Sequence, residues 1–351
     1  MQPTMTDVAR LAGVSQATVS HVVNGTASIS DNVVKKVQDA MRELGYVPSS
    51  ASRGARGDKA SVVGIVIPNV GIRFYGEIVH SIEQLLRQKG YVIFLCNTFY
   101  DSKLERTYVM ELIRHRAVGV IAGYGLLNEE SKALLKKHRI PTVMLDMERN
   151  LGEDYSVHID NQKLARMAVS HLYDVGARTI SYCSEPLRYE VLKTRYRYFQ
   201  EALEEFGLKF EEKNCFIEQT QSEDYRKVKM GYNIAANILM QDHIDAVFAS
   251  SDEFAFGIIS RMKEYGVDIP GDIQIMGCDN DPFSKLLTPS LTTIWQPITK
   301  MAEIGVLMLT NLMEGKPVEE REVCLEPSIV IRESTLKVRM QNCLDTNMEV
   351  K

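Results

Sequence analysis

The first 25 residues predict two short helices joined by a tight turn. The hydroxyl of Thr6 is a candidate N-cap of the first helix, because it can accept a hydrogen bond from a backbone N–H of the first turn. Gly13 can adopt the positive φ that the turn requires. Ser15 can cap the second helix, which Asn24 and Gly25 end. This order of elements is that of a helix-turn-helix unit.

The second predicted helix has two unlike faces when its residues are placed at 100° intervals. One face carries Thr18, Val19, Val22 and Val23, and the other carries Gln16, Ala17, Ser20, His21 and Asn24. A short helix with a small, hydrogen-bonding outer face fits the major groove of DNA, where base edges offer donors and acceptors. For this helix alone, a surface helix of an ordinary domain is an equally good interpretation.

A third helix is predicted from Asp31 to Leu44, with Ser30 as its N-cap and Gly45 after its last turn. Its apolar stripe consists of Val33, Val34, Val37, Met41 and Leu44. Three small helices around one core form the architecture of a helix-turn-helix domain. The third helix therefore favours DNA binding over the alternative.

Four stretches of this segment are similar to the headpiece of the lactose/galactose repressor (LacI/GalR) family of bacterial transcriptional regulators. They are Asp7–Ser15, Ala17–Ser20, Val23–Gly25 and Leu44–Pro48. The resemblance extends to about Ser334 and implies a repressor whose operator affinity is controlled by a small effector. It also implies a small all-α helix-turn-helix headpiece at 1–48, a hinge at 49–60, and an α/β two-lobed, periplasmic-binding-protein-like domain at 61–335.

Strand and helix patterns alternate beyond residue 60, beginning with a buried parallel-strand pattern at 62–67. The series restarts after Asp160, and repeated β–α units of this kind predict two doubly wound parallel sheets. The expected N-lobe comprises about 61–160 and 297–324, and the expected C-lobe comprises about 161–292 and 325–335. Three crossings near residues 160, 293 and 325 would permit hinge closure. The tail at 336–351 lacks leucine heptads, so a homodimer is expected rather than a coiled-coil tetramer.

The net charge of −5 is distributed unevenly along the 351 residues. Residues 1–60 hold seven Lys or Arg against five Asp or Glu, which gives +2 and leaves −7 for the remainder. A mildly basic headpiece on an acidic body fits a DNA-binding protein whose second domain stays off the phosphates. Because signal-peptide and membrane-span patterns are absent, a cytoplasmic protein without a membrane partner is expected. The six cysteines are scattered without a C-x-x-C pair, and neither a metal nor a cofactor is expected.

Residues 49–60 are small, polar and glycine-containing, which is typical of a flexible linker. In the resembled family the matching segment forms a hinge helix in the DNA minor groove, where a leucine wedges open a base step. That position is Ala55 here, and Gly54 and Gly57 each lower helix propensity by about 1 kcal/mol. We therefore expect weaker kinking of the operator than leucine gives. Comparing operator bending by the chain and by its Ala55→Leu variant tests this expectation.

The resemblance and the outer face of the second helix together assign the DNA contacts. His21 and Gln16 are the expected base readers. Thr6 and the backbone N–H of Ser15 are expected to hold phosphate. The full set of candidate DNA-binding residues is Thr6, Ser15, Gln16, Ala17, Thr18, Ser20, His21, Asn24 and Ala55. A dimer with two such headpieces predicts a near-palindromic operator in double-stranded DNA.

Ligands of open α/β sheets bind outside the carboxyl ends of the strands. Residues at or near such ends are candidate effector contacts, namely Asn69, Phe74, Asp146, Ser251, Asp252, Asp279 and Gln296. The family resemblance implies ligand contacts for Asp146, Asp279 and Gln296, and it adds Arg195 in a later helix. Ser251 stands where an asparagine is common in the family.

The chemistry of these residues predicts a sugar or sugar derivative as the effector. Carboxylates, an amide and an arginine supply donors and acceptors for neighbouring hydroxyls, and an aromatic face packs on an apolar ring surface. Other assignments stay open. Asp146 and Asp279 could cap a following turn or helix, and Arg195 could form a surface salt bridge. A nucleobase or a protein corepressor could replace the sugar.

Two other functional classes fit the sequence less well. It contains no G-x-G-x-x-G, P-loop, H-E-x-x-H or G-x-S-x-G motif, so an enzyme is not expected. A transport binding protein would share the two-lobed body. It would, however, need export and would have no use for a helix-turn-helix headpiece.

Overall fold

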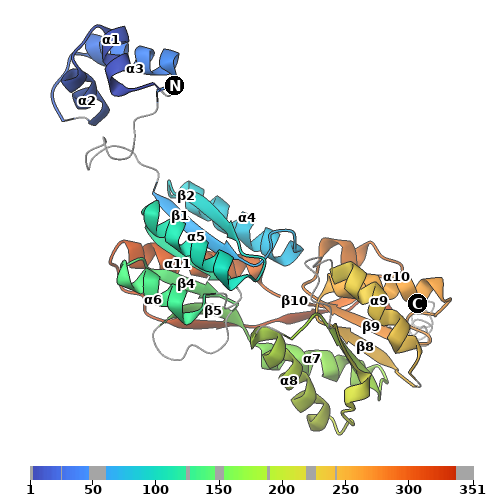
Figure 1. The fold of residues 1–351 in the computed structure, drawn as a ribbon. Coiled ribbons are helices and arrows are strands. Elements are labelled where there is room, and N and C mark those ends of the chain that lie inside the picture. The colour runs from blue at the N-terminus through green and yellow to red at the C-terminus, as the bar shows by residue number, and fades with distance from the viewer. Residues whose placement is uncertain are drawn as a thin grey trace, which may run out of the picture. The chain divides into compact units, whose positions relative to one another are not determined.

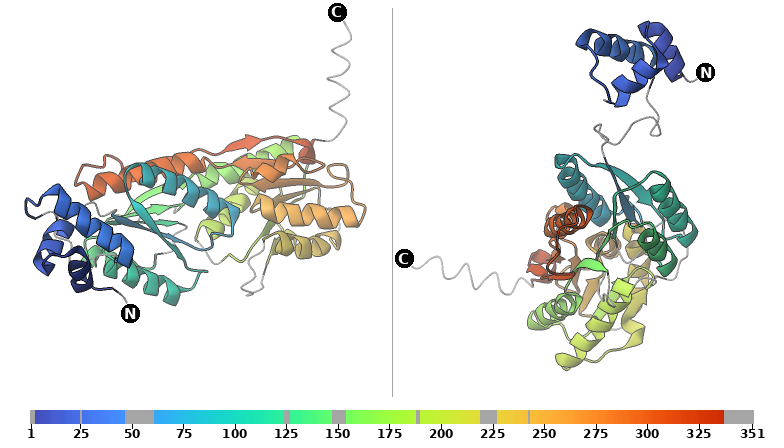
Figure 2. Two further views of the ribbon diagram at one scale, coloured as in Figure 1. Left: turned by 90° about the horizontal axis from the view of Figure 1, so that it is seen from above. Right: turned by 90° about the vertical axis from the view of Figure 1, so that its left-hand side faces the viewer.

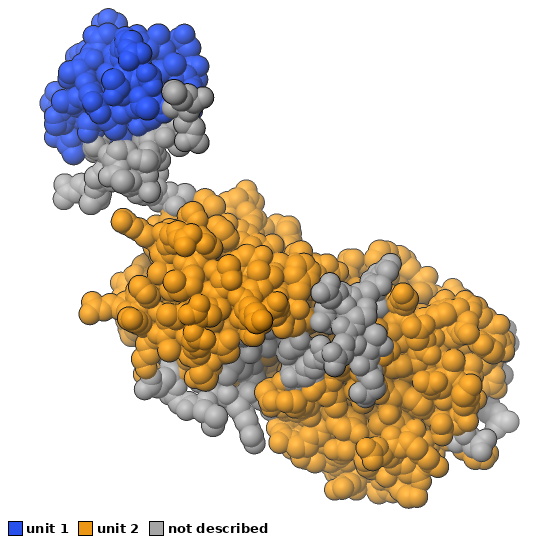
Figure 3. Space-filling view, viewed as in Figure 1, with its two compact units in different colours: residues 1–60 blue, residues 61–351 orange. Residues whose placement is uncertain are grey.

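The computed structural model describes residues 3–24, 26–46, 61–123, 127–146, 154–187, 190–218, 227–241 and 243–336. The chain forms two compact units, residues 1–60 and residues 61–351 (Figure 3). Ala55 and the rest of the predicted hinge lie outside the described residues, as do the tail beyond 336 and the side chain of Asn24.

The described part of the first unit consists of three helices, α1 Met5–Ala12, α2 Gln16–Asn24 and α3 Asp31–Leu44 (Figure 1). Their shared core is centred on Val8, Val19 and Val37, whose side chains are fully buried. Gly13 adopts the predicted positive φ of 67° between α1 and α2. Ser30 is at the N-cap position of α3 but forms no side-chain capping bond. The expected helix-turn-helix headpiece is confirmed.

The capping of α1 differs from the prediction. Its N-cap is Thr4 and not Thr6, because the Asp7 N–H donates to Thr4 Oγ1 at 3.3 Å and the Thr4 N–H donates to Asp7 Oδ2 at 2.8 Å. This reciprocal capping box satisfies two orphan donors, which Thr6 cannot do from inside the first turn. Ser15 caps α2 as predicted, since its Oγ accepts from the Thr18 N–H at 3.0 Å.

The described part of the second unit contains two six-stranded sheets. The first, in the order β11-β5-β4-β3-β1-β2, consists of β1 Val62–Ile67, β2 Val92–Asn97, β3 Gly119–Gly123, β4 Thr142–Leu145, β5 Tyr155–Ile159 and β11 Glu322–Leu325. The second, in the order β12-β10-β9-β8-β6-β7, consists of β6 Ile180–Ser184, β7 Cys215–Ile217, β8 Ala246–Ala249, β9 Gln274–Cys278, β10 Thr292–Trp295 and β12 Ser328–Val330. We call the parts built around these sheets the first and second lobes.

The predicted doubly wound sheets are confirmed, with one correction at an edge. Neighbouring strands pair in parallel except for β10 and β12, which are antiparallel. The chain leaves the second lobe through β10 and enters it again through β12. These two strands must therefore run in opposite directions.

Helices cover both faces of each sheet (Figure 1). Those of the first lobe are α4 Arg73–Gln88, α5 Ser102–Arg114, α6 Glu129–Lys137 and α11 Ile298–Met313, and those of the second are α7 Asn161–Asp174, α8 Glu190–Glu205, α9 Lys227–Leu239 and α10 Asp252–Glu264. In the first lobe Ile65 packs in the cluster with α4 and α11, whereas Val66 packs in the cluster with α5 and α6. Alternate strand residues thus face opposite helix layers, and α11 lies beside α4 (Figure 2).

Three connections join the lobes, after Ile159, Trp295 and Leu325. Because β5 and β10 each leave their parallel sheet at a carboxyl end, the carboxyl ends of both sheets face the junction. The fold therefore concentrates the residues that follow the strands between the two lobes. Within the described residues, no helix has the length and apolarity needed to cross a membrane.

Candidate functional site

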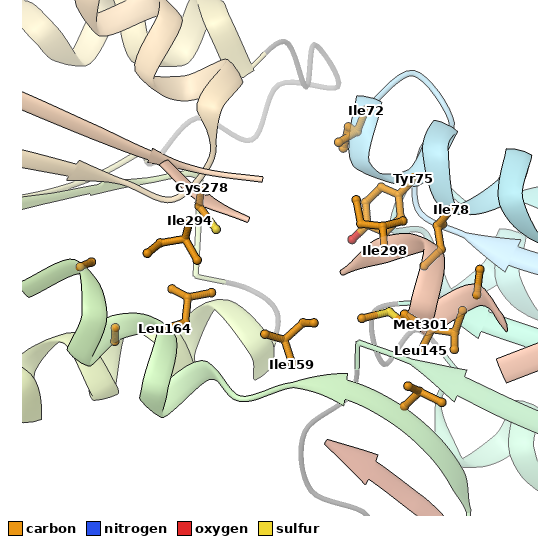
Figure 4. Close-up of a cluster of buried hydrophobic side chains, with 14 of the residues drawn as sticks. Ile72, Tyr75, Ile78, Leu145, Ile159, Leu164, Cys278, Ile294, Ile298 and Met301 are labelled. Atoms are coloured by element: carbon orange, nitrogen blue, oxygen red, sulfur yellow. The ribbon is translucent and has the colours of Figure 1, made fainter. Parts of the chain in front are cut away.

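A solvent-open cavity of about 380 Å³ lies at this junction. Its lining comes from both lobes and consists of Ile72, Phe74, Tyr75, Tyr100, Asp146, Glu185, Leu192, Arg195, Lys227, Ser250, Asp279 and Gln296. Apolar side chains of the two lobes face each other here, with Ile72, Tyr75 and Ile298 on one side and Cys278 and Ile294 on the other (Figure 4). This volume includes open solvent. A pocket between two lobes on which polar groups converge is a candidate small-molecule site.

Asp146 and Asp279 reach the cavity through an unusual backbone conformation. Asp146 follows β4 with a φ of 54°, and Asp279 follows β9 with a φ of 116°. Their backbone N–H groups donate to Val157 O and Ile294 O, each at 2.8 Å, and so continue the sheet ladders. Residues other than glycine seldom adopt positive φ, and such strain is concentrated at functional sites.

Arg195 projects from α8 and is 5% exposed, so it is not the surface salt bridge that the sequence left open. Its Nε and Nη2 donate to Asn161 Oδ1 at 3.1 Å each, and Nη1 donates to Ser250 O at 3.3 Å. Burial alone would lower the pKa of Arg195, but the neighbouring Cys278 thiol, Tyr182 hydroxyl and carboxylates of Asp146 and Asp279 raise it. These contacts hold a permanent positive charge at the cavity wall.

Gln296 follows β10 and is bound to the same carboxylate cluster. Its Nε2 donates to Asp279 Oδ1 at 2.6 Å, and its buried Oε1 has no hydrogen-bond partner among the residues that the structure describes. Burial raises the pKa of Asp279 well above the ordinary value for a carboxyl group. An orphaned buried acceptor costs free energy, which a ligand that donates a hydrogen bond would recover.

Glu185 and Lys227 are cavity residues that the sequence analysis missed. Lys227 Nζ lies 2.8 Å from Glu185 Oε1, and the Ser250 hydroxyl donates to Glu185 Oε2. Burial opposes ionisation, but the ammonium of Lys227 and its hydrogen bond hold the pKa of Glu185 at about 2. Glu185 directly follows β6, so the rule that found Asp146 and Asp279 could have found it. Lys227 begins a helix and carries no comparable signal.

Three of the predicted effector contacts are absent from the lining of this cavity and have structural partners instead. Asn69 Oδ1 accepts from the Gly71 N–H at 2.8 Å in the turn before α4. Ser251 is the N-cap of α10, where its Oγ accepts from the Phe254 N–H at 3.4 Å. Asp252 is fully buried, and it belongs to the lining of an adjoining cavity that shares Phe74 and Asp279 with this one. Phe74, Asp146, Arg195, Asp279 and Gln296 do line the cavity.

Asp252 holds three segments of the second lobe together. Its Oδ2 accepts from Ser284 Oγ at 2.6 Å and from the Asp281 N–H at 2.7 Å, and its Oδ1 accepts from Thr293 Oγ1 at 2.6 Å. Burial raises the pKa of Asp252 to about 7, although the bonds from Ser284 and Thr293 oppose the rise. Through these hydrogen bonds Asp252 in α10 connects the loop after β9 to β10.

The raised pKa predicts a pH dependence of stability. Between about pH 4 and pH 7 the unfolded chain has lost the Asp252 proton while the folded chain retains it. The free energy of unfolding should thus fall as pH rises, by about 1.4 kcal/mol per pH unit for this carboxyl. Urea unfolding of the wild type and Asp252→Asn across this range measures the difference. Equal pH slopes in the two proteins would contradict the assignment.

The outer face of α2 carries most of the candidate DNA contacts. Gln16, Ala17 and His21 are exposed, whereas Ser20 and Thr18 are half-buried. The Thr18 hydroxyl is hydrogen-bonded to Ser15 Oγ at 2.8 Å, and His21 Nδ1 is hydrogen-bonded to Thr26 Oγ1 at 2.8 Å. Ser15 and Thr6 are also exposed.

Comparison with known proteins identifies the two parts of the chain. The profile "Bacterial regulatory proteins, lacI family" matches residues 4–49, and the profile "Periplasmic binding protein-like domain" matches residues 169–335. The HTH-type transcriptional repressor PurR of Mannheimia succiniciproducens is 31% identical over 338 residues, which cover 95% of this chain and 99% of that protein. The chain belongs to the LacI family.

Solved structures of this family resemble the chain over most of its length. The lac repressor dimer bound to operator and the anti-inducer ONPF gives a TM-score of 0.75 at 25% identity, covering 96% of this chain and 100% of that chain. A LacI-family regulator of Enterococcus faecium with bound ribose gives a TM-score of 0.70 at 28% identity. That match covers 79% of this chain and 99% of that chain. The chain is a DNA-binding transcriptional repressor with a ligand-binding domain, and its relatives are regulators rather than enzymes.

Proposed function

We propose that this LacI-family repressor binds a near-palindromic operator as a homodimer, and that a sugar in the inter-lobe cavity controls its operator affinity. The observation that supports a sugar is the gathering of carboxylates, an amide and a guanidinium in one cavity beside aromatic rings. Phe74 and Tyr75 form an edge-to-face pair there, with ring centroids 5.3 Å apart. Closely spaced donors and acceptors suit a ring with several hydroxyls. The ribose bound to the related Enterococcus faecium regulator agrees with this choice.

The cavity couples effector binding to the arrangement of the lobes. Arg73 at the start of α4 belongs to the first lobe, and its Nε lies 2.9 Å from Asp281 Oδ2 in the second. The Arg73 guanidinium also lies 5.1 Å from the ring centroid of Phe283. A ligand that contacts both lobes stabilises one inter-lobe angle and shifts the equilibrium between DNA-binding states.

A thermal-shift screen of the full chain tests the sugar assignment. We expect a pentose or hexose to raise Tm, because a ligand at 100 times its Kd stabilises the folded state by about 2.7 kcal/mol. Nucleobases are screened in parallel at the same concentrations. The sugar assignment fails if no sugar raises Tm and a nucleobase does.

His21→Ala is expected to weaken operator binding by about 1–3 kcal/mol and to relax the preference at one base position. Since Thr26 occupies Nδ1, the exposed imidazole presents Nε2 to a base edge. Binding to an operator selected from random DNA, and to its single-base variants, measures the effect. Thr26→Val is the milder companion variant, because it keeps the imidazole and removes only the bond that orients it. A uniform loss over all sequences would make His21 a phosphate contact instead.

The dimer surface that we propose includes β2. This strand is an edge of the first sheet, and its Val92 and Leu95 are 51% and 36% exposed. An exposed apolar edge strand can pair with a strand of another chain, and exposed apolar patches mark sites of association. Leu95→Asp is therefore expected to shift the protein from dimer to monomer in sedimentation velocity, and operator affinity should fall with it. A dimer that persists in this variant would exclude β2 from the interface.

A further inference from the structure

We infer that the effector of this repressor is not an anion, and that Glu185 imposes this selectivity by keeping Lys227 paired. The inference rests on the proposed function insofar as the junction cavity is the effector site. It does not depend on whether the ligand is a sugar or another uncharged molecule. Neither residue belongs to the cluster around Arg195 that the family resemblance implied.

The two side chains form one fixed pair at the cavity wall. Lys227 Nζ and Glu185 Oε1 are 2.8 Å apart, and the two side chains are only 15% and 14% exposed. Ser250 donates to the other carboxylate oxygen of Glu185, which ties the pair to the end of β8. The pair therefore has little freedom to open for a ligand, because both charges would lose their partner in a poorly solvated place.

The charges of the described lining residues nearly cancel. The carboxyl groups of Asp146, Glu185 and Asp279 face the cations Arg195 and Lys227, which gives −1 when all are ionised and 0 when Asp279 is protonated. Burial raises the pKa of Asp279, which favours its neutral form, so the net charge of these lining residues approaches zero. A phosphate ester would bring about two further negative charges. Both cations already have carboxylate neighbours, so they would not offset these charges.

A single substitution separates the two roles of Glu185. Glu185→Gln keeps the size of the side chain and an oxygen that accepts from Ser250, but it removes the negative charge beside Lys227. Only the weaker attractions of Asp279 and Glu253 then remain, so the ammonium of Lys227 becomes an anion-binding group, as lysine is at many phosphate sites. We expect this variant to bind inorganic phosphate and ribose 5-phosphate about tenfold or more tightly than the wild type. The affinity for ribose should differ between the variant and the wild type by less than the affinity for ribose 5-phosphate does.

The experiment measures Tm and calorimetric affinity of the full chain with ribose, glucose, their phosphate esters and inorganic phosphate alone. The matched control is Glu190→Gln on the same helix as Arg195, because Glu190 is 82% exposed and pairs with Lys193 at 2.7 Å. The control should bind phosphate no better than the wild type. If Glu185→Gln does not fold, the inference is still tested by comparing the affinity of the wild type for each sugar with its affinity for the phosphate ester of that sugar.

The possible results separate this inference from the sugar assignment. Tighter binding of a sugar phosphate than of its parent sugar by the wild type would overturn the inference and leave a sugar-responsive repressor. Equal phosphate affinity in Glu185→Gln and the wild type would also overturn it. If only an uncharged nucleobase binds the wild type, the sugar assignment fails. A gain of phosphate binding by Glu185→Gln would then still support the role of Glu185.

Discussion

Arg195→Met is expected to abolish the response of operator binding to the effector. Arg195 is the most buried cation of the cavity, and its hydrogen bonds to Asn161 and Ser250 use most of the five guanidinium donors. Methionine fills a similar volume but removes the positive charge that attracts the carboxyl groups of Asp146 and Asp279. Removing one partner from a buried charged cluster costs about 2–5 kcal/mol of binding free energy. Effector affinity should thus fall by roughly a hundredfold or more.

The measurement is operator binding by fluorescence anisotropy, with and without the sugar that stabilises the wild type. Arg195→Met should still bind the operator, but its affinity should no longer change at effector concentrations that saturate the wild type. Arg197→Met on the same helix is the matched control, because Arg197 is 45% exposed and its described partners are Glu201 and the ring of Tyr198. A normal effector response in Arg195→Met would remove Arg195 from the site.

Gly257→Ala is expected to lower the free energy of unfolding by about 3 kcal/mol or more. A Cβ at Gly257 in α10 would lie 1.9 Å from Val228 O and 2.5 Å from Tyr232 N, both backbone atoms of α9. Helix backbones cannot yield as side chains do, so the two helices must separate. The roughly 1 kcal/mol by which alanine favours a helix over glycine does not offset this loss.

Urea unfolding of the wild type and Gly257→Ala measures this loss. Gly305→Ala is its control, because the added Cβ of that variant would meet the tip of the Leu145 side chain at 2.8 Å rather than backbone. Gly305→Ala should lower the free energy of unfolding distinctly less than Gly257→Ala does. Equal losses in the two variants would show that general crowding, and not the backbone contact between α9 and α10, governs this position.

The sequence was most informative where structure depends on neighbouring residues. The positive φ of Gly13, the capping of α2 by Ser15 and the bounds of α3 all follow from interactions within a few residues. The apolar strand runs and the residues at or near their ends likewise predicted the sheets and four cavity residues, and the family resemblance added Arg195. The error at Thr6 arose because Thr4 and Asp7 together form a better cap, a pairing that single-residue preferences do not weigh.

The helix-turn-helix headpiece, the two α/β lobes and the family could be predicted from the residues alone, because these are encoded in local capping, periodicity and motif residues. Which strand-end residues face the cavity became known from the packed fold. The packed fold turned Asp252 toward Ser284 and Thr293, and it brought Glu185 together with Lys227. Such partners are distant in the chain and meet only when strands and helices pack. The charge balance that we assign to the effector site is therefore a property of the fold.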